Sequence, residues 1–320
     1  MSSLVRRLMM IAVVVCSTAA AEDYPNRPIR FVVPFPPGGS ADILARTVGD
    51  KLATALRQPV VVENKPGAGG IVGAEAVAKS APDGYTLLFA NTNIAINPSL
   101  YRSLPYDTAK AFAPVIQLVS VPNLLLVAED VPANSVADLI ALAKAKPGTL
   151  NYASAGNGTF PHLAIELFKL QAGVSLVHVP YKGAAPALNA LLAKEVQVLS
   201  NDLLNALPLV KAGKIKALAI TGTVRSAATP EIPTMAEAGL KNYAAVGWQG
   251  VMVPAGTPAA IVARLNSEIN KALNDTVLKD RLTAQGLEVV GGTVQQFAEF
   301  VRRDTERWRS AVEASGAKID

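Results

Sequence analysis

The sequence predicts an α/β protein with two doubly wound domains. Short β-branched runs alternate with segments whose apolar residues recur every four positions, which is the pattern of strands and helices in turn. A glycine-rich turn between a strand and a helix occurs once in each half. The 320 residues suffice for two domains of ordinary size, and 50% hydrophobic against 17% charged residues allows a sizeable core.

The first strand and helix lie between Ile29 and Leu56. Ile29–Val33 is apolar and β-branched and predicts a buried strand. Pro34–Ser40, PFPPGGS, ends it, and from Ala41 onward apolar residues at four-residue steps predict a helix. Ser40 occupies the position expected of the N-cap.

This turn has a possible chemical use. The first turn of a helix carries unpaired N–H groups and the positive end of the helix dipole. Gly38 and Gly39 lack a Cβ and let a ligand approach the backbone. The pattern therefore indicates an anion site, with an ordinary βα turn as the alternative.

The next segment continues the doubly wound pattern. Pro59–Glu63 predicts a strand, glycines from Gly67 open a helix that runs to about Lys79, and Tyr85–Ala90 predicts a third strand. The loops that begin at Pro34, Lys65 and Asn91 should then meet at the carboxyl edge of the sheet, where ligands bind in such folds.

A dinucleotide site is not expected at these glycines. Val72 stands where the third glycine of the G-x-G-x-x-G pattern belongs, and Asn91 follows the next strand where an acidic residue would hold a ribose.

The middle of the chain predicts a crossing into a second domain. Residues 97–112 look irregular, and Val115–Ser120 predicts a strand. Pro122 is expected to interrupt the extended run before Leu124–Ala128.

The second domain is expected to repeat the strand, glycine loop and helix arrangement of the first. After a helix over Val136–Lys146 and a strand over Leu150–Ala153, the loop Ser154–Thr159 is polar and glycine-rich. Pro161 falls in the first turn of the helix that follows, a favoured place for proline. This arrangement indicates a second candidate anion site.

The remaining segments complete both domains. The chain is expected to return to the first domain at Ile215–Thr221. The predicted domains are residues 22–121 and 223–320 for the first and 122–222 for the second. The other predicted strands are Val174–Val179, Val196–Asn201 and Val246–Val253, and the predicted helices are Gly183–Ala193, Leu203–Ala212, Ile261–Leu273 and Val294–Glu313.

Residues 1–21 predict a signal peptide. Arg6 and Arg7 form a basic region, Leu8–Val15 is too short to span a bilayer, and the A-x-A site at Ala19–Ala21 predicts cleavage near Ala21 and export to the periplasm. A lipid anchor on Cys16 is the alternative.

Composition excludes several classes of function. Cys16, the single cysteine, leaves with the leader, and the two histidines form no H-E-x-x-H motif, so we expect no metal and no cofactor. The formal charge of +5 falls by two when the leader is removed. With no basic run and only 5% aromatic residues, a nucleic-acid partner is not expected.

Several motifs resemble one family along nearly the whole mature chain. YPNRPIRFVVPFPPGGSADILAR, VVVENKPGAGGIVGAEAVAKSAPDGYTLLFA, NYASAGNGTFPHLAIELF, VHVPYKGAAPALNALL and WQGVMVPAGTP are similar to the receptors of tripartite tricarboxylate transporters, also called Bug or TctC-like proteins. The resemblance implies a two-lobed periplasmic binding protein of type II, with two α/β domains joined by a hinge. It also implies a monomer that delivers a small organic carboxylate to a membrane permease.

The resemblance also implies the ligand contacts. Backbone amides, hydroxyls and bridging waters, usually without an arginine, would hold the ligand. The residues carried over are Phe35, Gly38, Gly39, Ser40, Asp42 and Asn91 in the first lobe, and Ser154, Gly156, Thr159, His162, Tyr181 and Asn201 in the second. Pro36 and Pro37 depart from the family pattern and should stiffen the first loop.

Some of these residues have a structural alternative. Asp42 lies in a first helical turn, which favours acids whatever the function, and would repel a bound carboxylate, so it could orient the loop or a water. His162 could donate to a ligand or be structural, and His178, inside a strand, is expected to be structural. Lys182 could supply a counter-charge but is expected to be solvated.

Two other functions stay open. A secreted hydrolase could use Ser154, but no G-x-S-x-G motif surrounds it, and a triad with His162 and Asp42 would span two lobes. A receptor that serves a signalling partner would have the same closed, liganded form. We expect a binding protein and no enzyme.

Overall fold

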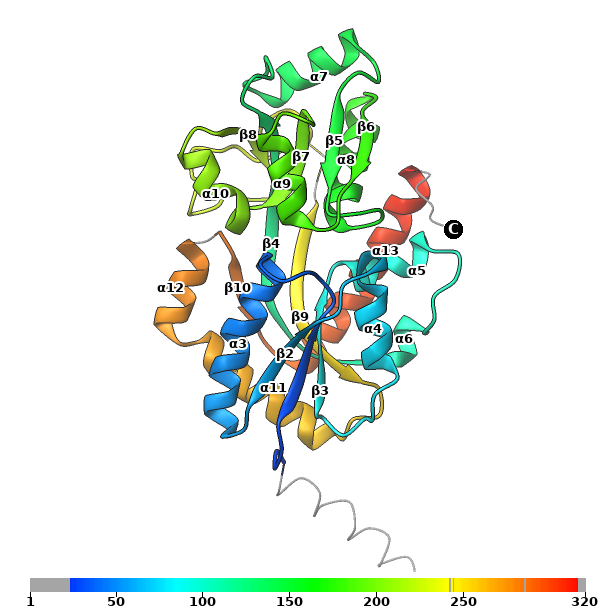
Figure 1. Ribbon diagram of the computed structural model, residues 1–320, viewed down its shortest axis with the longest axis vertical. Coiled ribbons are helices and arrows are strands. Elements are labelled where there is room, and N and C mark those ends of the chain that lie inside the picture. The colour runs from blue at the N-terminus through cyan, green and yellow to red at the C-terminus, as the bar shows by residue number, and fades with distance from the viewer. Residues whose placement is uncertain (1–23, 242, 244, 285, 316–320) are drawn as a thin grey trace, which may run out of the picture.

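The computed structural model describes residues 24–241, 243, 245–284 and 286–315 and shows two lobes joined by long strands (Figure 1). The predicted signal peptide, its cleavage site near Ala21 and Cys16 lie outside the described residues. No helix in the described part of the chain is long and apolar enough to cross a membrane.

One sheet runs through both lobes, as far as the described residues show. Its order is β2-β1-β3-β9-β4-β7-β5-β6, and β8 and β10 each pair with β4. The strands are β1 (Ile29–Val33), β2 (Val60–Asn64), β3 (Thr86–Asn91), β4 (Phe112–Ala128), β5 (Asn151–Ser154), β6 (Val177–Pro180), β7 (Val198–Asp202), β8 (Ile215–Ile220), β9 (Val246–Pro254) and β10 (Glu288–Gly291).

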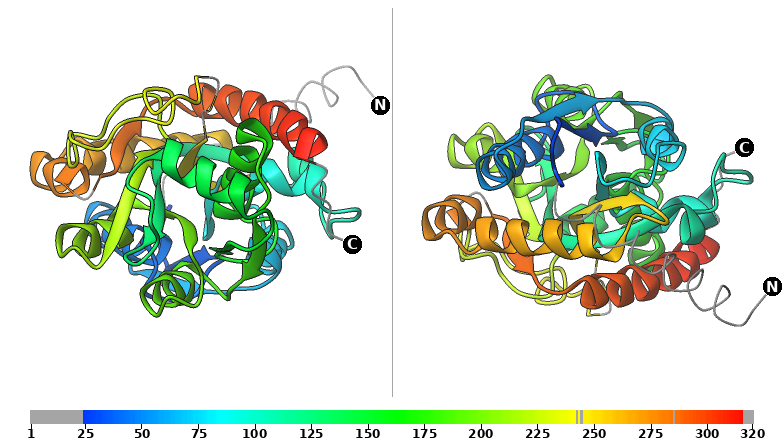
Figure 2. Two further views of the ribbon diagram at one scale, coloured as in Figure 1. Left: turned by 90° about the horizontal axis from the view of Figure 1, so that it is seen from above. Right: turned by 90° about the horizontal axis from the view of Figure 1, so that it is seen from below.

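Helices cover both faces of the sheet in each lobe, which confirms the predicted two-lobed α/β fold (Figures 1 and 2). They are α3 (Ser40–Leu56), the 3₁₀ turn η1 (Ala68–Gly70), α4 (Ile71–Ala78), α5 (Asn93–Leu100), α6 (Thr108–Ala111), α7 (Val136–Ala145), α8 (Phe160–Ala172), α9 (Ala184–Leu192), α10 (Leu203–Lys211), α11 (Ala259–Leu273), α12 (Thr276–Ala284) and α13 (Val294–Ser315).

The parallel strands of the first lobe place their loops at one edge, as predicted. β1 pairs in parallel with β2 and β3. The Asn93 side chain at the start of α5 donates to the carbonyl of Gly69 at 2.8 Å, and Gly70 packs against Phe35. The three loops therefore meet beside the N-terminus of α3.

β4 is one continuous strand through both lobes, so the predicted interruption at Pro122 is wrong. Before Pro122 the strand pairs with β9, and from Asn123 onward it pairs with β7. Pro122 itself is the last residue of the ladder with β9, opposite Val246. A proline lacks the N–H that a ladder needs, and here it stands where the strand changes partners.

The return to the first lobe occurs later than predicted. Ile215–Ile220 forms β8, which pairs with the second-lobe end of β4, and β9 is the strand that crosses back to β3. Within the segment that follows β8, Tyr243 donates to the carbonyl of Ala164 in α8, and Ala245 donates to Thr221. These contacts favour a second domain boundary nearer 245 than 222, although the boundaries themselves stay a prediction.

Residues 97–112 are also more regular than predicted. They hold the end of α5, the short helix α6 and the first residue of β4. Pro98 lies inside α5, and burial of Ile94, Ile96 and Leu100 stabilises this helix despite the proline.

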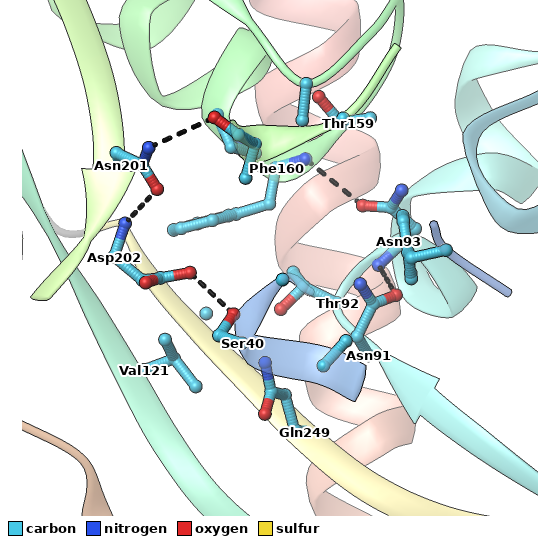
Figure 3. Close-up of a pocket in the computed structure, with 18 of the residues that line it drawn as sticks. Ser40, Asn91, Thr92, Asn93, Val121, Thr159, Phe160, Asn201, Asp202 and Gln249 are labelled. Carbon is cyan, nitrogen blue, oxygen red and sulfur yellow. Dashed lines mark hydrogen bonds between the residues drawn. The ribbon is translucent and has the colours of Figure 1, made fainter. Parts of the chain in front are cut away.

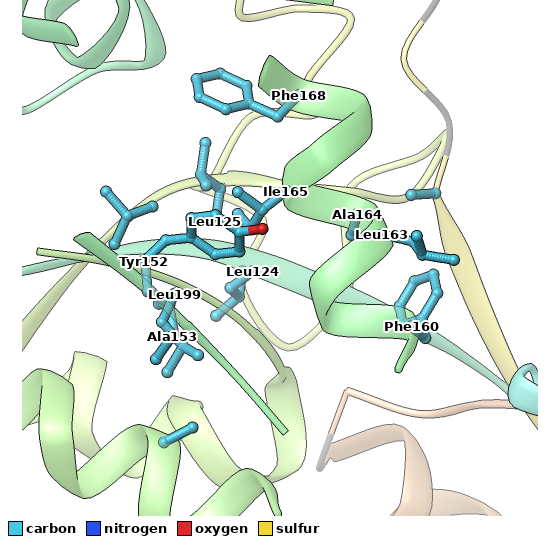
Figure 4. Close-up of a cluster of buried hydrophobic side chains, with 14 of the residues drawn as sticks. Leu124, Leu125, Tyr152, Ala153, Phe160, Leu163, Ala164, Ile165, Phe168 and Leu199 are labelled. Carbon is cyan, nitrogen blue, oxygen red and sulfur yellow. The ribbon is translucent and has the colours of Figure 1, made fainter. Parts of the chain in front are cut away.

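Each lobe has an apolar core between sheet and helices. In the first lobe α3 and α11 bury Leu44, Val48 and Leu265 against the sheet. In the second lobe α8 lies over β4, β5 and β7 and buries Phe168 and Ile165 beside Tyr152 (Figure 4). α13 runs along one side of the molecule against α5 and touches α8 (Figure 2). The cores fix the helix N-termini that face the gap between the lobes.

Candidate functional site

A cavity of about 250 Å³ lies between the two lobes, at the carboxyl ends of the strands (Figure 3). It is lined by Phe35, Pro36, Pro37, Gly39, Ser40, Ala41, Asn91, Thr92, Asn93, Val121, Asn123, Ala155, Thr159, Phe160, Pro161, Lys182, Gly183, Ala184, Ala185, Pro186, Asn201, Asp202, Gly247, Trp248 and Gln249.

The first helix N-terminus at this cavity belongs to α3. Its N-cap is Gly39, not Ser40 as predicted, and no side chain caps it. Ser40 is instead the first helical residue, and the N–H groups of Ser40 and Ala41 have no partner within the helix. Gly39, Ser40 and Ala41 all line the cavity, so this end of α3 offers donors to an anion there.

The second helix N-terminus belongs to α9. Its N-cap Gly183 has φ +119° and no capping side chain, and Ala184 and Ala185 of its first turn line the cavity. The predicted second anion site was the start of α8. There the Phe160 N–H already donates to Asn93 Oδ1 of the other lobe at 3.1 Å, and Pro161 has no N–H to offer. α9 also has a proline in its first turn, Pro186, but the N–H groups of Ala184 and Ala185 precede it and have no partner within the helix, so α9 has more free donors at the cavity than α8.

The structure brings together six of the twelve predicted ligand contacts. The six that line the cavity are Phe35, Gly39, Ser40, Asn91, Thr159 and Asn201. The six that do not line it are Gly38, Asp42, Ser154, Gly156, His162 and Tyr181. Contact of any of the twelve with a ligand stays a prediction.

Asp42 holds the first loop in shape. Its carboxylate accepts from the Gly38 N–H and the Asn64 side chain, both at 3.0 Å, and pairs with Arg46 at 2.9 Å. Burial raises the pKa of Asp42, but these donors outweigh burial and leave the pKa below its usual value. The geometry agrees with the loop-orienting alternative for this residue.

His162 belongs to a stacked cluster inside the second lobe. Its ring stacks on His178 with 4.0 Å between centroids, and His178 stacks on Tyr152 at 4.8 Å. Its Nδ1 accepts from the Gly158 N–H at 3.1 Å. Burial lowers the pKa of both histidines, for His178 to about 3, so both rings are neutral near pH 7.

The loop residues of the second lobe support each other. Ser154 is fully buried, and its Oγ lies 2.6 Å from His178 Nε2 and donates to the Gly156 carbonyl at 3.0 Å. Tyr181 is half-buried, and its hydroxyl donates to Glu195 at 3.2 Å. Ser154 is therefore shielded from the cavity in which a substrate would sit.

Sequence reasoning missed Asp202, which reaches the cavity from the end of β7. Its Oδ2 accepts from Ser40 Oγ at 2.6 Å across the two lobes (Figure 3), and its Oδ1 caps α10 by accepting from the Asn205 N–H at 3.0 Å. Burial raises its pKa, and the bonds from Ser40 and Asn205 act in the opposite sense. Its place at a strand end, next to the predicted Asn201, was the available signal.

The wall formed by β9 was also missed. Trp248 donates its backbone N–H to Thr92 Oγ1 and its indole N–H to the buried Asp304 at 2.6 Å. Gln249 is buried, and its Oε1 has no hydrogen-bond partner among the residues that the structure describes. Gln249 thus has amide capacity that a ligand or a water could satisfy.

Charges are few at the cavity. Of the residues that line it, Lys182 is the one cation and Asp202 the one anion, and Lys182 is exposed. No group of three or more possible metal ligands exists among the described residues. The site is therefore suited to bind a small molecule mainly through backbone N–H groups and neutral side chains.

Comparison with known proteins places this geometry in context. BugT of Bordetella pertussis is 39% identical over 95% of this chain and 94% of its own length. Rpa4515 of Rhodopseudomonas palustris, solved with adipate, is 38% identical with a TM-score of 0.90 and covers 93% of this chain and 100% of its own. MatC of the same organism, with bound malate, is 34% identical with a TM-score of 0.84 and covers 90% of this chain and 100% of its own length.

The sequence profile of the tripartite tricarboxylate transporter family receptor, TctC, matches residues 44–317. This match confirms the resemblance seen in the sequence motifs, and the two-lobed fold agrees with it. The chain belongs to the tripartite tricarboxylate transporter receptor family.

Proposed function

We propose that this protein is a periplasmic receptor that captures a small organic dicarboxylate between its lobes and delivers it to a tripartite tricarboxylate-type permease. One observation carries the proposal. Two helix N-termini without capping side chains, α3 from one lobe and α9 from the other, face one cavity. Each offers N–H donors and a partial positive charge, which is what a carboxylate requires.

Cavity size and the relatives support a small acid as the ligand. About 250 Å³ suits a molecule of a few carbon atoms with two carboxylates, one at each helix. Two members of similar structure hold adipate and malate. Delivery to a permease and export to the periplasm follow from membership of the family.

Closure of the lobes would complete the site. Asn93 Oδ1 of the first lobe accepts from the Phe160 N–H of the second at 3.1 Å, and Pro36 packs against Gly183. Lobes that swing apart about β4 and β9 would break these contacts and open the cavity to water. We propose that the receptor acts as a monomer, because one chain supplies both helix N-termini.

Thermal unfolding with a ligand panel tests the proposal. The mature protein, unfolded and refolded to remove carried-over ligand, is heated with mono-, di- and tricarboxylates, amino acids and aromatic acids. A ligand at a hundred times its dissociation constant should add about 2.7 kcal/mol and raise the Tm by several degrees. Stabilisation by a dicarboxylate that is recovered intact supports a receptor, and conversion of the ligand supports a hydrolase. No shift with any acid would reject carboxylate binding.

A further inference from the structure

We infer that Asp202 and Ser40 select dicarboxylates that carry a hydrogen-bond donor beside one carboxylate, that is, a hydroxyl or ammonium group on the 2-carbon. The inference rests on the proposed function and narrows it to a class of substrate. It comes from the corner of the cavity where the end of β7 meets the start of α3 (Figure 3).

Among the described residues, every polar contact of the Asp202 carboxylate is with a donor. Oδ2 accepts from Ser40 Oγ at 2.6 Å and lies 3.4 Å from Asn205 Nδ2, while Oδ1 accepts from the Asn205 N–H at 3.0 Å. These donors favour the ionised carboxylate and act against burial, which raises the pKa of Asp202. A carboxylate has about four acceptor sites, so these three leave one for a group in the cavity.

Ser40 also presents an acceptor to the cavity. A hydroxyl has one proton, and Ser40 gives it to Asp202. What remains on Ser40 Oγ is lone pairs. The two side chains together therefore accept hydrogen bonds at this corner, and a ligand group placed there has to donate.

Charge repulsion strengthens this requirement. A bare ligand carboxylate beside Asp202 would place two negative charges together, and Lys182, the one cation among the lining residues, is exposed. A hydroxyl or ammonium between the two anions removes the unfavourable contact and adds a charge-assisted hydrogen bond.

The position of the donor on the ligand follows from the backbone. The N–H groups of Ser40 and Ala41 belong to the first turn of α3 and point at the cavity beside the Ser40 side chain. A carboxylate bound to these N–H groups brings its own 2-carbon next to Ser40 Oγ and Asp202. A donor on that carbon is thus within reach, and a donor further along the chain is not.

Calorimetric titration of the refolded mature protein tests the inference with matched acids at pH 7.5. Three acids that differ only at the 2-carbon are compared at each length: succinate, malate and aspartate; glutarate, 2-hydroxyglutarate and glutamate; adipate, 2-hydroxyadipate and 2-aminoadipate. At the preferred length, the hydroxy or amino acid should bind about 10- to 100-fold more tightly than the plain acid. Comparison of the 2-hydroxy acid with the 2-amino acid shows which donor the site prefers.

Two variants assign the preference to this corner. Asp202→Asn keeps a side chain able to cap α10 but replaces the acceptor with an amide, so the preference should fall below about threefold. Asp107→Asn is the matched control, because Asp107 also caps a helix, α6, and lies outside the cavity. It should leave the preference unchanged. If Asp202→Asn does not fold, Ser40→Ala, which removes the second acceptor, should lower the preference in the same direction.

The outcomes separate this inference from the proposed function. The inference is overturned if a plain dicarboxylate binds as tightly as its substituted forms at every length. It is also overturned if the preference survives Asp202→Asn or, where that variant does not fold, Ser40→Ala. Either result leaves the receptor role intact. Failure of every acid to bind the wild-type protein rejects the proposed function and the inference with it.

Discussion

The stacked histidines predict that the protein loses stability as the pH falls from 7.5 to 5.5, and that His178→Gln flattens this loss. His178 stacks against the rings of both His162 and Tyr152 and contacts Ser154 Oγ at 2.6 Å. Burial, with repulsion from His162 as a smaller cause, lowers its pKa to about 3. The folded protein therefore keeps this ring neutral through the whole pH range of the experiment.

The sign and the size follow from proton linkage. In the unfolded chain the pKa of a histidine is about 6.5, so the unfolded state binds a proton between pH 7.5 and 5.5 and the folded state does not. Stability is thus complete above the unfolded pKa and lost as the pH falls below it. Integration to pH 5.5 gives a loss of about 1.4 kcal/mol for His178, or about 3 °C in Tm. His162, whose pKa burial also lowers, adds to the loss.

Glu166, the carboxylate that contacts this cluster, is held away from this pH range. Glu166 pairs with Lys169 at 2.6 Å, and bonds from Lys169 and Tyr152 outweigh its burial and keep its pKa below the usual value. Its titration therefore lies further below the pH range of the experiment than that of an ordinary glutamate. Burial raises the pKa of Asp202 and Asp304, which would add stability on acidification, so the difference between the variant and the wild type is the quantity to measure.

Urea unfolding at steps of half a pH unit provides that difference. His178→Gln is expected to unfold more easily at pH 7.5 but to lose about 1.4 kcal/mol less than the wild type on going to pH 5.5. Phe168→Leu is the matched control, because it alters the same core without removing a titrating group or a donor to one. Equal pH slopes for His178→Gln and the wild type would refute the argument that His178 is held neutral.

Three further predictions concern contacts between the lobes. Ser40→Ala leaves the buried Asp202 without its 2.6 Å donor and should lower the free energy of unfolding by about 1–3 kcal/mol, seen as a lower Tm. Gly183→Ala adds a Cβ to a residue whose φ is +119°, and that Cβ would lie 3.4 Å from the Pro36 side chain of the first lobe. Carboxylate affinity should therefore fall about tenfold in a titration. Gly173→Ala, strained at φ +62° but in open space, should leave that affinity unchanged. Asn93→Ala removes the acceptor of the Phe160 N–H at the start of α8 and should lower the free energy of unfolding in urea by about 1–3 kcal/mol. An unchanged urea midpoint would show that this hydrogen bond contributes nothing to stability.

The sequence allowed most of the fold to be predicted, because its apolar pattern is local information. The run Ile29–Val33 and the four-residue spacing after Ala41 are visible in any short window, and both elements formed as expected. The failures were long-range. Pro122 ends the ladder with β9, and nothing in its own neighbourhood shows that β4 continues with a different partner.

The same distinction separates the site residues that could be predicted from those that could not. The start of α3 was predicted from its glycine turn and from the four-residue apolar spacing that follows it. The loop before α8 looked equally suitable, but its first N–H is taken by Asn93, which lies 67 residues earlier in the chain. The Ser40 hydroxyl, expected to cap its own helix, bonds to Asp202, which is 162 residues away. Hydrogen bonds between lobes therefore decided which candidate donors stay free.

The physics of the helix N-termini explains why such a site needs two lobes and can do without an arginine. The end of one helix carries about half an elementary charge, and in open water its attraction for a carboxylate is weak. When α3 and α9 face one closed cavity, two such ends act on one ligand in a medium of lower dielectric constant, and the attraction grows. In the proposed opening about β4 and β9, the helices would separate and water would return, so the affinity would fall without any charged side chain having to leave the ligand. A receptor that must release its cargo benefits from holding it by an arrangement that opening removes.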